Sequence, residues 1–134
     1  MSNRKDGTDF EKEFCEILAE HGFWCHNLAQ KASGQPFDVI IARRCRTYPV
    51  DCKVCKNDKF DTRRIEDNQK LAMTKWRKCG NNMGWFALKL SNGDIYMVSH
   101  RAIEEFRCVT ERKIMNVEDM AKNGWLLERW LVHF

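Results

Sequence analysis

Two carboxylates and a lysine form the clearest chemical pattern in the sequence. Asp38 stands just before the β-branched run 39–42, and Asp51 and Lys53 lie two residues apart in the next apolar stretch. Side chains alternate along a strand, so Asp51 and Lys53 share one face. A basic turn joins the two stretches, which predicts adjacent antiparallel strands and brings Asp38 close to Asp51. Neighbouring carboxylates repel unless a cation lies between them, and oxygen ligands of this kind suit Mg²⁺ or Mn²⁺.

A lysine beside such a metal site has two chemical uses. Lys53 could orient or deprotonate an attacking water, or stabilise the charge of a phosphorane-like transition state. The alternative is structural, with Asp38 ending a loop and Asp51 and Lys53 on an exposed strand face. Asp is unfavourable in the middle of a strand, so the pattern favours a functional site.

The elements that must position these residues follow the order α-β-β-β-α-β-β-α, with a second short helix after the last one. We predict helices over residues 8–21, 61–78, 99–106 and 117–122, and strands over 23–28, 38–42, 48–55, 85–90 and 95–98. Thr8 and Glu11 have the spacing of a capping box, Gly22 can end the first helix, and Asn92-Gly93 predicts a hairpin turn. This order predicts an α/β (α+β) domain with a mixed central sheet flanked by helices.

Charge and composition narrow the possible partners. The chain has 134 residues, enough for one domain, and a net charge of +4. Residues 31–78 hold 13 Lys and Arg against 6 Asp and Glu, which suits a polyanion such as nucleic acid but also an ordinary solvated surface. No apolar run is long enough to cross a membrane. The first residues lack the apolar segment of a secretory signal, so we expect a cytoplasmic protein.

Seven cysteines in a chain without an export signal are expected to be free thiols. Cys52 and Cys55 have a CxxC spacing, but residues three apart on a strand point to opposite faces and cannot readily bind one zinc ion. Burial as small hydrophobic side chains is the better interpretation. A zinc or thiol-redox protein remains a weaker alternative, because the four histidines show no ligand spacing either.

The same residues resemble a known nuclease motif. Pro36-Phe37-Asp38 followed by Asp51-Cys52-Lys53 resembles the PD-(D/E)XK motif of the restriction-endonuclease-like superfamily. Residues 7–11 resemble the "G..FE" start of its first helix, Ser33-Gly34 resembles the "SG" loop of Holliday junction resolvases, and Gln69 resembles a glutamine near the active site. The likeness covers residues 7–98 and is closest to the small Holliday junction resolvases.

This resemblance implies a divalent-metal-dependent DNA endonuclease that cuts four-way junctions as a homodimer, in recombination, repair or phage DNA processing. Water would attack in line and leave 5′-phosphate and 3′-hydroxyl ends. The implied metal ligands are Glu11, Asp38, Asp51 and the backbone carbonyl of Cys52, with Mg²⁺ or Mn²⁺ as cofactor. Lys53 would position the water and stabilise charge, and Gln69 would support Lys53 or the phosphate. The expected DNA contacts are Lys31, Ser33, Arg43, Arg44, Arg46, Lys56, Lys59, Arg63 and Arg64.

Several alternatives stay open at this point. Glu11 could serve only the capping box, in which case Glu13 is the fallback ligand. The chain could be another nuclease of the same fold, such as a virus-type replication-repair nuclease acting on flaps or ends, or a DNA-binding module without activity. The domain is expected to span 1–134, and its aromatic C-terminal part, 99–134, could belong to the core or form a dimer contact.

Overall fold

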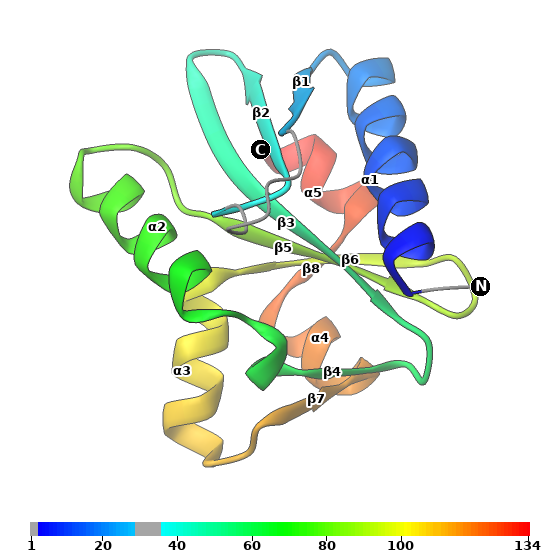
Figure 1. Cartoon of the computed structure of the whole chain (residues 1–134), viewed down its shortest axis with the longest axis vertical. Helices are drawn as coiled ribbons and strands as arrows, with labels where there is room; N and C mark the ends of the chain where they lie inside the picture. The colour runs from blue at the N-terminus through cyan, green and yellow to red at the C-terminus, as the bar shows by residue number, and fades with distance from the viewer. Residues whose placement is uncertain (1–2, 29–35) are drawn as a thin grey trace.

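A six-stranded sheet forms the centre of the protein, which is described by a computed structural model over residues 3–28 and 36–134 (Figure 1). The strand order is β1-β2-β3-β5-β6-β8. These strands are β1 (Trp24–Asn27), β2 (Val39–Arg43), β3 (Arg46–Cys55), β5 (Trp85–Leu90), β6 (Ile95–Ser99) and β8 (Trp125–Leu126). Strands β3 and β5 pair in parallel and the other neighbours pair antiparallel. The mixed sheet predicted from the sequence is therefore confirmed.

Helices cover both faces of this sheet and divide the core in two. Helices α1 (Asn3–Glu20) and α5 (Leu127–His133) enclose one cluster of buried apolar side chains. Helices α2 (Asp67–Lys78), α3 (His100–Thr110) and α4 (Val117–Asn123) enclose the other. A separate two-stranded sheet pairs β4 (Lys59–Asp61) with β7 (Ile114–Asn116), and the sequence did not predict it. None of the described helices combines the length and apolar character needed to cross a bilayer.

The β2–β3 hairpin places the predicted site residues side by side. Arg44 and Cys45 have φ angles of 53° and 65°, which make the two-residue turn that suits the twist of paired strands. The register that follows pairs Val39 with Val50. The amide of Asp38 donates to the carbonyl of Val50 at 3.1 Å, so Asp38 stands just before the first residue of β2 and beside the middle of β3.

The first helix begins earlier than predicted. Helix α1 starts at Asn3 rather than after Thr8, so the Thr8 cap is wrong. The Asp6 carboxylate lies 2.7 Å from Nζ of Lys56, just beyond the end of β3. This ion pair ties the additional turn to the sheet, and it offsets the poor helix propensity of Gly7 and Thr8. The helix ends as predicted, at Gly22 with a φ of 85°.

The helix predicted from Asp61 to Lys78 is divided. Asp61 caps only the 3₁₀ turn η1 (Thr62–Arg64), because the main chain is then extended at Ile65 and Glu66. Thr62 holds this break in place, since its amide and hydroxyl both donate to the carbonyl of Lys113, at 2.8 and 2.7 Å. Helix α2 therefore begins at Asp67, and its first turn faces the strand that carries Asp51.

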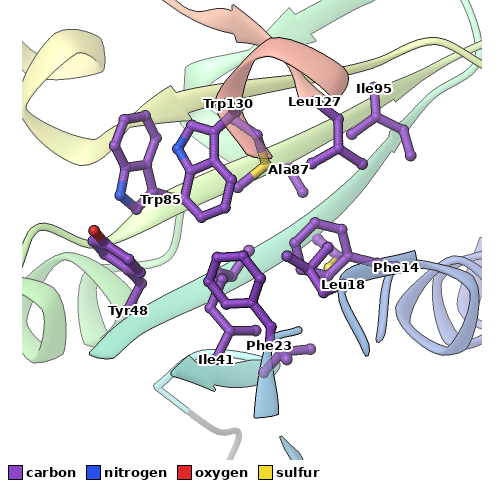
Figure 2. Close-up of a cluster of buried hydrophobic side chains, with 14 of the residues drawn as sticks. Phe14, Leu18, Phe23, Ile41, Tyr48, Trp85, Ala87, Ile95, Leu127 and Trp130 are labelled. Atoms are coloured by element: carbon purple, nitrogen blue, oxygen red, sulfur yellow. The ribbon is translucent and has the colours of Figure 1, made fainter. Parts of the chain in front are cut away.

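The C-terminal helix belongs to the main core. Trp130 is fully buried, and its ring lies 5.6 Å from the rings of Phe23, Tyr48 and Trp85 (Figure 2). These three residues come from β3, β5 and the segment before β1, so α5 closes the space between α1 and the sheet. Helix α5 therefore packs into the core cluster that α1 covers.

Replacing this tryptophan tests that conclusion. Trp130→Ala is expected to lower the free energy of unfolding by about 3–5 kcal/mol, because it leaves a large cavity among aromatic rings. Val132, on the same helix, is 75% exposed, and Val132→Ala should change the free energy by less than about 0.5 kcal/mol. Urea unfolding measures both. Equal midpoints for the two variants would show that α5 does not contribute to the core.

Candidate active site

All five residues predicted to be catalytic line a single cleft of about 660 Å³. Glu11 comes from α1, Asp38 from the start of β2, Asp51 and Lys53 from β3, and Gln69 from the first turn of α2. The strand alternation and the hairpin register bring the two aspartates together, as the sequence predicted.

Asp51 is the most enclosed member of the cluster. Its side chain is 0% exposed, and Oδ1 accepts a hydrogen bond from Nε2 of Gln69 at 2.9 Å. Oδ2 lies 2.9 Å from Nζ of Lys53. Burial, followed by the negative charge of Asp38, raises the pKa of Asp51 well above its usual value, and Lys53 opposes this shift. The carboxylate is held in place at an electrostatic cost that a second cation would reduce.

Asp38 extends the hydrogen bonding of β2 with its side chain. Its Oδ2 accepts from the main-chain N–H of Cys52 at 2.9 Å. If β2 were longer, the main-chain carbonyl of one of its residues would accept this hydrogen bond instead. The N–H and C=O of one strand residue point toward the same neighbour. The carbonyl of Cys52 is therefore on the Asp38 side of β3, as a backbone metal ligand would need to be.

Glu11 completes the group of carboxylates. It is 8% exposed, and burial together with the charge of Asp38 raises its pKa to about 7, against the opposing effect of Lys53. Because α1 begins at Asn3, Glu11 lies in the middle of the helix and is not needed for capping. Glu13 lies outside the cleft and forms a 2.7 Å ion pair with Lys89. The geometry favours Glu11 over Glu13 as the helix ligand.

The donor set fits a divalent cation by its chemistry. Burial and the negative charge of Asp38 raise the pKa values of Glu11 and Asp51, and a cation among the carboxylates would relieve both effects. Oδ2 of Asp51 makes no hydrogen bond of regular geometry, although Lys53 lies close to it. Within residues 3–28 and 36–134, no three acidic, histidine or cysteine side chains are already arranged as a metal centre. Lys53 supplies the cation that Asp51 faces in this structure.

Gln69 connects the start of α2 to the buried carboxylate. Its Oε1 accepts from the amide of Glu66 at 3.1 Å, within a capping box, while its Nε2 donates to Asp51. Because Oε1 of Gln69 is bonded to the amide of Glu66, the Nε2 end of the side chain faces Asp51. Gln69 is therefore a positioning residue for Asp51.

Removing that amide is expected to slow cleavage without preventing binding. Gln69→Leu leaves Oδ1 of Asp51 without its donor, and loss of such a partner typically costs about 10–100-fold in activity. Junction cleavage under single-turnover conditions measures the effect, with junction affinity measured in parallel. Asn68→Leu, at the neighbouring exposed position, serves as control. A Gln69→Leu protein that cleaves as fast as the control would contradict the positioning role.

The predicted DNA contacts are divided among several places. Lys56, Lys59 and Arg64 line the cleft beside the carboxylates. Arg63 lies outside it and pairs with Asp61 at 2.7 Å. Lys31 and Ser33, with the predicted SG loop, lie outside the described residues.

The basic β2–β3 turn is separate from this cleft. Arg44 and Arg46 are exposed there, whereas Arg43 is partly buried. The Arg43 guanidinium donates to the carbonyls of His21 and Leu131, at 2.9 and 2.7 Å, and lies over the Phe23 ring. These bonds hold α5 against the end of α1, so Arg43 has a structural role.

Some cleft residues were not predicted. Asp6 and Thr8 line the cleft from α1, and Ile114 lines it from β7. Thr8 lies three residues before Glu11. A predicted helix that began before Thr8 would have placed both side chains on one helix face and so identified Thr8 as a cleft residue. Ile114 carries no such signal, since its place depends on the pairing of two three-residue strands far apart in the sequence.

A mixed sheet lies between helices, and Asp38 stands beside the Asp51–Lys53 pair on the adjacent strand β3, which is the arrangement that the resemblance to restriction-endonuclease-like nucleases implies. Residues 1–131 match the family model described as archaeal Holliday junction resolvase (Hjc). The chain belongs to this family and is a junction-resolving nuclease.

One solved structure shows how far the fold is shared. The 1.6 Å structure of Hjc from the hyperthermophilic archaeon Archaeoglobus fulgidus, a Holliday junction resolvase, superposes with a TM-score of 0.71. The match covers 93% of this chain and 99% of the Archaeoglobus fulgidus chain, at 19% sequence identity. At this identity the likeness shows the fold. No curated protein sequence matches this chain.

Proposed function

We propose that the chain is a divalent-metal-dependent endonuclease that cuts four-way DNA junctions. The observation that carries the proposal is the convergence of Glu11, Asp38, Asp51 and Lys53 in one cleft beside basic residues. Three acidic side chains in a buried cluster destabilise the fold unless they serve a cation. The neighbouring lysines and arginines attract a polyanion to the same place.

Each residue has a distinct role in this proposal. Glu11, Asp38 and Asp51 would hold Mg²⁺ or Mn²⁺, together with the backbone carbonyl of Cys52. The bound cation would neutralise charge on the scissile phosphate and make a nearby water more acidic. Lys53 orients that water and donates to the phosphate oxygens as their negative charge grows. Gln69 keeps the Asp51 carboxylate in a fixed orientation through its 2.9 Å hydrogen bond.

The water attacks in line with the leaving oxygen, and the products are a 5′-phosphate and a 3′-hydroxyl. The described chain has one such cleft, whereas resolving a junction requires two symmetry-related nicks. We therefore infer a homodimer, in which each chain cuts one strand. We also infer that a protein with a DNA substrate acts inside the cell.

A panel of DNA structures tests the proposal. Purified protein with Mg²⁺ is expected to nick a synthetic four-way junction on two opposed strands and to leave linear duplex intact. A chelator should abolish the cleavage. Preferential cutting of flaps or ends would instead assign the same residues to a replication-repair nuclease. Binding of the junction without cleavage, with either metal, would overturn the proposal in favour of an inactive binding module.

The basic residues that line the cleft, Lys56, Lys59 and Arg64, are expected to act mainly on the affinity for DNA. Lys59 is exposed at the edge of the cleft, and Lys59→Ala should lower junction affinity several-fold and reduce the slope of log K against log salt by about 0.9. Lys122→Ala, on α4 and outside the cleft, serves as the control. Fluorescence anisotropy at several salt concentrations measures both slopes. Identical slopes for wild type and Lys59→Ala would place the DNA elsewhere.

A further inference from the structure

Two cysteines on different elements face each other beside the active site. Cys15 lies on α1, one turn after Glu11, and Cys25 lies in the middle of β1, the edge strand of the sheet. Both side chains pack against the core cluster that α1 covers, and each is partly exposed. The turn at Gly22 brings the strand that carries Cys25 back beside the helix that carries Cys15, and a hydrogen bond between the two thiols is the largest influence on the pKa of each.

The local fold explains why these thiols meet. On β1 the neighbours Trp24 and His26 are exposed and stack on each other, so the alternation of the strand turns Cys25 to the opposite face, toward α1. The turn at Gly22 folds the chain back so that β1 runs beside α1, with the amide of Phe23 bonded to the carbonyl of Leu18 at 3.0 Å.

We propose that Cys15 and Cys25 form a reversible disulfide that ties α1 to the edge strand β1. The hydrogen bond lowers the pKa of Cys15 and raises that of Cys25, which makes Cys15 the first nucleophile. A third cysteine, Cys52, belongs to the core cluster against which both pack; it is buried and has poorer access to an oxidant. Cys45, Cys79 and Cys108 are exposed, so they are the competing sites.

The reaction needs a low-molecular-weight disulfide as oxidant. The thiolate of Cys15 attacks one sulfur of that disulfide, forming a mixed disulfide and releasing one small thiolate, which takes up a proton. The sulfur of Cys25, losing its proton, then attacks the Cys15 sulfur and expels the second small thiolate. Two protein thiols are oxidised, and the small disulfide is reduced to two thiols.

The cross-link would close a short loop around the turn at Gly22. Constraining the unfolded chain in this way is expected to raise Tm by about 5–10 °C. The helix that carries Glu11 would be covalently fixed to the sheet, whatever DNA the cleft accepts.

Peptide mapping of the full chain tests the proposal. A background variant with Cys45→Ser, Cys79→Ser and Cys108→Ser is incubated with glutathione disulfide, and remaining thiols are alkylated in denaturant. We expect one intramolecular bond that joins the Cys15 and Cys25 peptides, with a higher Tm that dithiothreitol reverses. Adding Cys25→Ser, or separately Cys25→Ala, should abolish both the bond and the shift.

Three results would overturn the proposal. In the first, both thiols remain free for alkylation after oxidation. In the second, glutathione stays attached to Cys15 without closure to Cys25. In the third, the bond joins either cysteine to Cys52 in place of its proposed partner.

Discussion

Asp51→Asn is expected to abolish junction cleavage while making the metal-free protein more stable. The variant removes one carboxylate from the proposed metal site, and we expect a loss of about 10³-fold or more in the single-turnover rate. Its side chain keeps the shape of aspartate, and its oxygen can still accept from Gln69. The change therefore affects charge far more than packing.

The gain in stability follows from the raised pKa of Asp51. A carboxyl whose pKa is higher in the folded state than in the unfolded state destabilises the fold above the folded pKa, and it has no such effect below the unfolded pKa near 4. Near pH 8 the amide removes this cost. We therefore expect the free energy of unfolding of the metal-free variant to be higher than that of wild type at this pH.

Asp58→Asn is the matched control. Asp58 lies outside the cleft, and its carboxylate accepts from the amide and hydroxyl of Ser91, at 2.8 and 2.9 Å. These bonds lower the pKa of Asp58, so its replacement should reduce stability slightly and leave cleavage unchanged. Urea unfolding and a junction cleavage assay give both quantities. An Asp51→Asn protein that cuts normally, or that loses stability as the control does, would contradict the account.

Lys53→Met is expected to lower both the cleavage rate and the free energy of unfolding. Without the ammonium group, growing charge on the scissile phosphate is not neutralised, and we expect cleavage to fall by about 10³-fold. Asp51 also loses its 2.9 Å ion pair in a buried position. The free energy of unfolding should fall by about 1–3 kcal/mol near pH 8. Junction affinity in a chelator should change little.

A second lysine on the same sheet provides the comparison. Lys89 on β5 pairs with Glu13 of α1 at 2.7 Å and lies outside the cleft. Lys89→Met removes an ion pair of similar length and should leave the cleavage rate within about twofold of wild type. A comparable loss of cleavage in both variants would show that Lys53 acts through the fold rather than on the phosphate.

The core of the site could be predicted because it depends on local rules. Strand alternation places Asp51 and Lys53 on one face, and the short basic turn sets the register that brings Asp38 beside them. Both rules act within one hairpin. The resemblance to known nucleases then added Glu11 and Gln69, which come from helices on either side of that hairpin.

The parts that could not be predicted depend on long-range contacts. Helix α1 is lengthened by the ion pair between Asp6 and Lys56, which are 50 positions apart in the sequence. The break before α2 depends on Thr62 bonding to Lys113, and this break places Gln69 in the first turn of α2. Local propensity contains no information on such partners, so a continuous helix was predicted where the chain has two short ones.

The most direct test of the account is single-turnover cleavage of a synthetic four-way junction by wild type and by Asp38→Asn. Asp38 is chosen because its carboxylate faces both the Cys52 amide and the other acidic side chains. The account predicts paired nicks by wild type with Mg²⁺ or Mn²⁺, none with a chelator, and a loss of about 10³-fold in the variant. Cleavage that persists in the chelator, or an Asp38→Asn protein that cuts as fast as wild type, would contradict it.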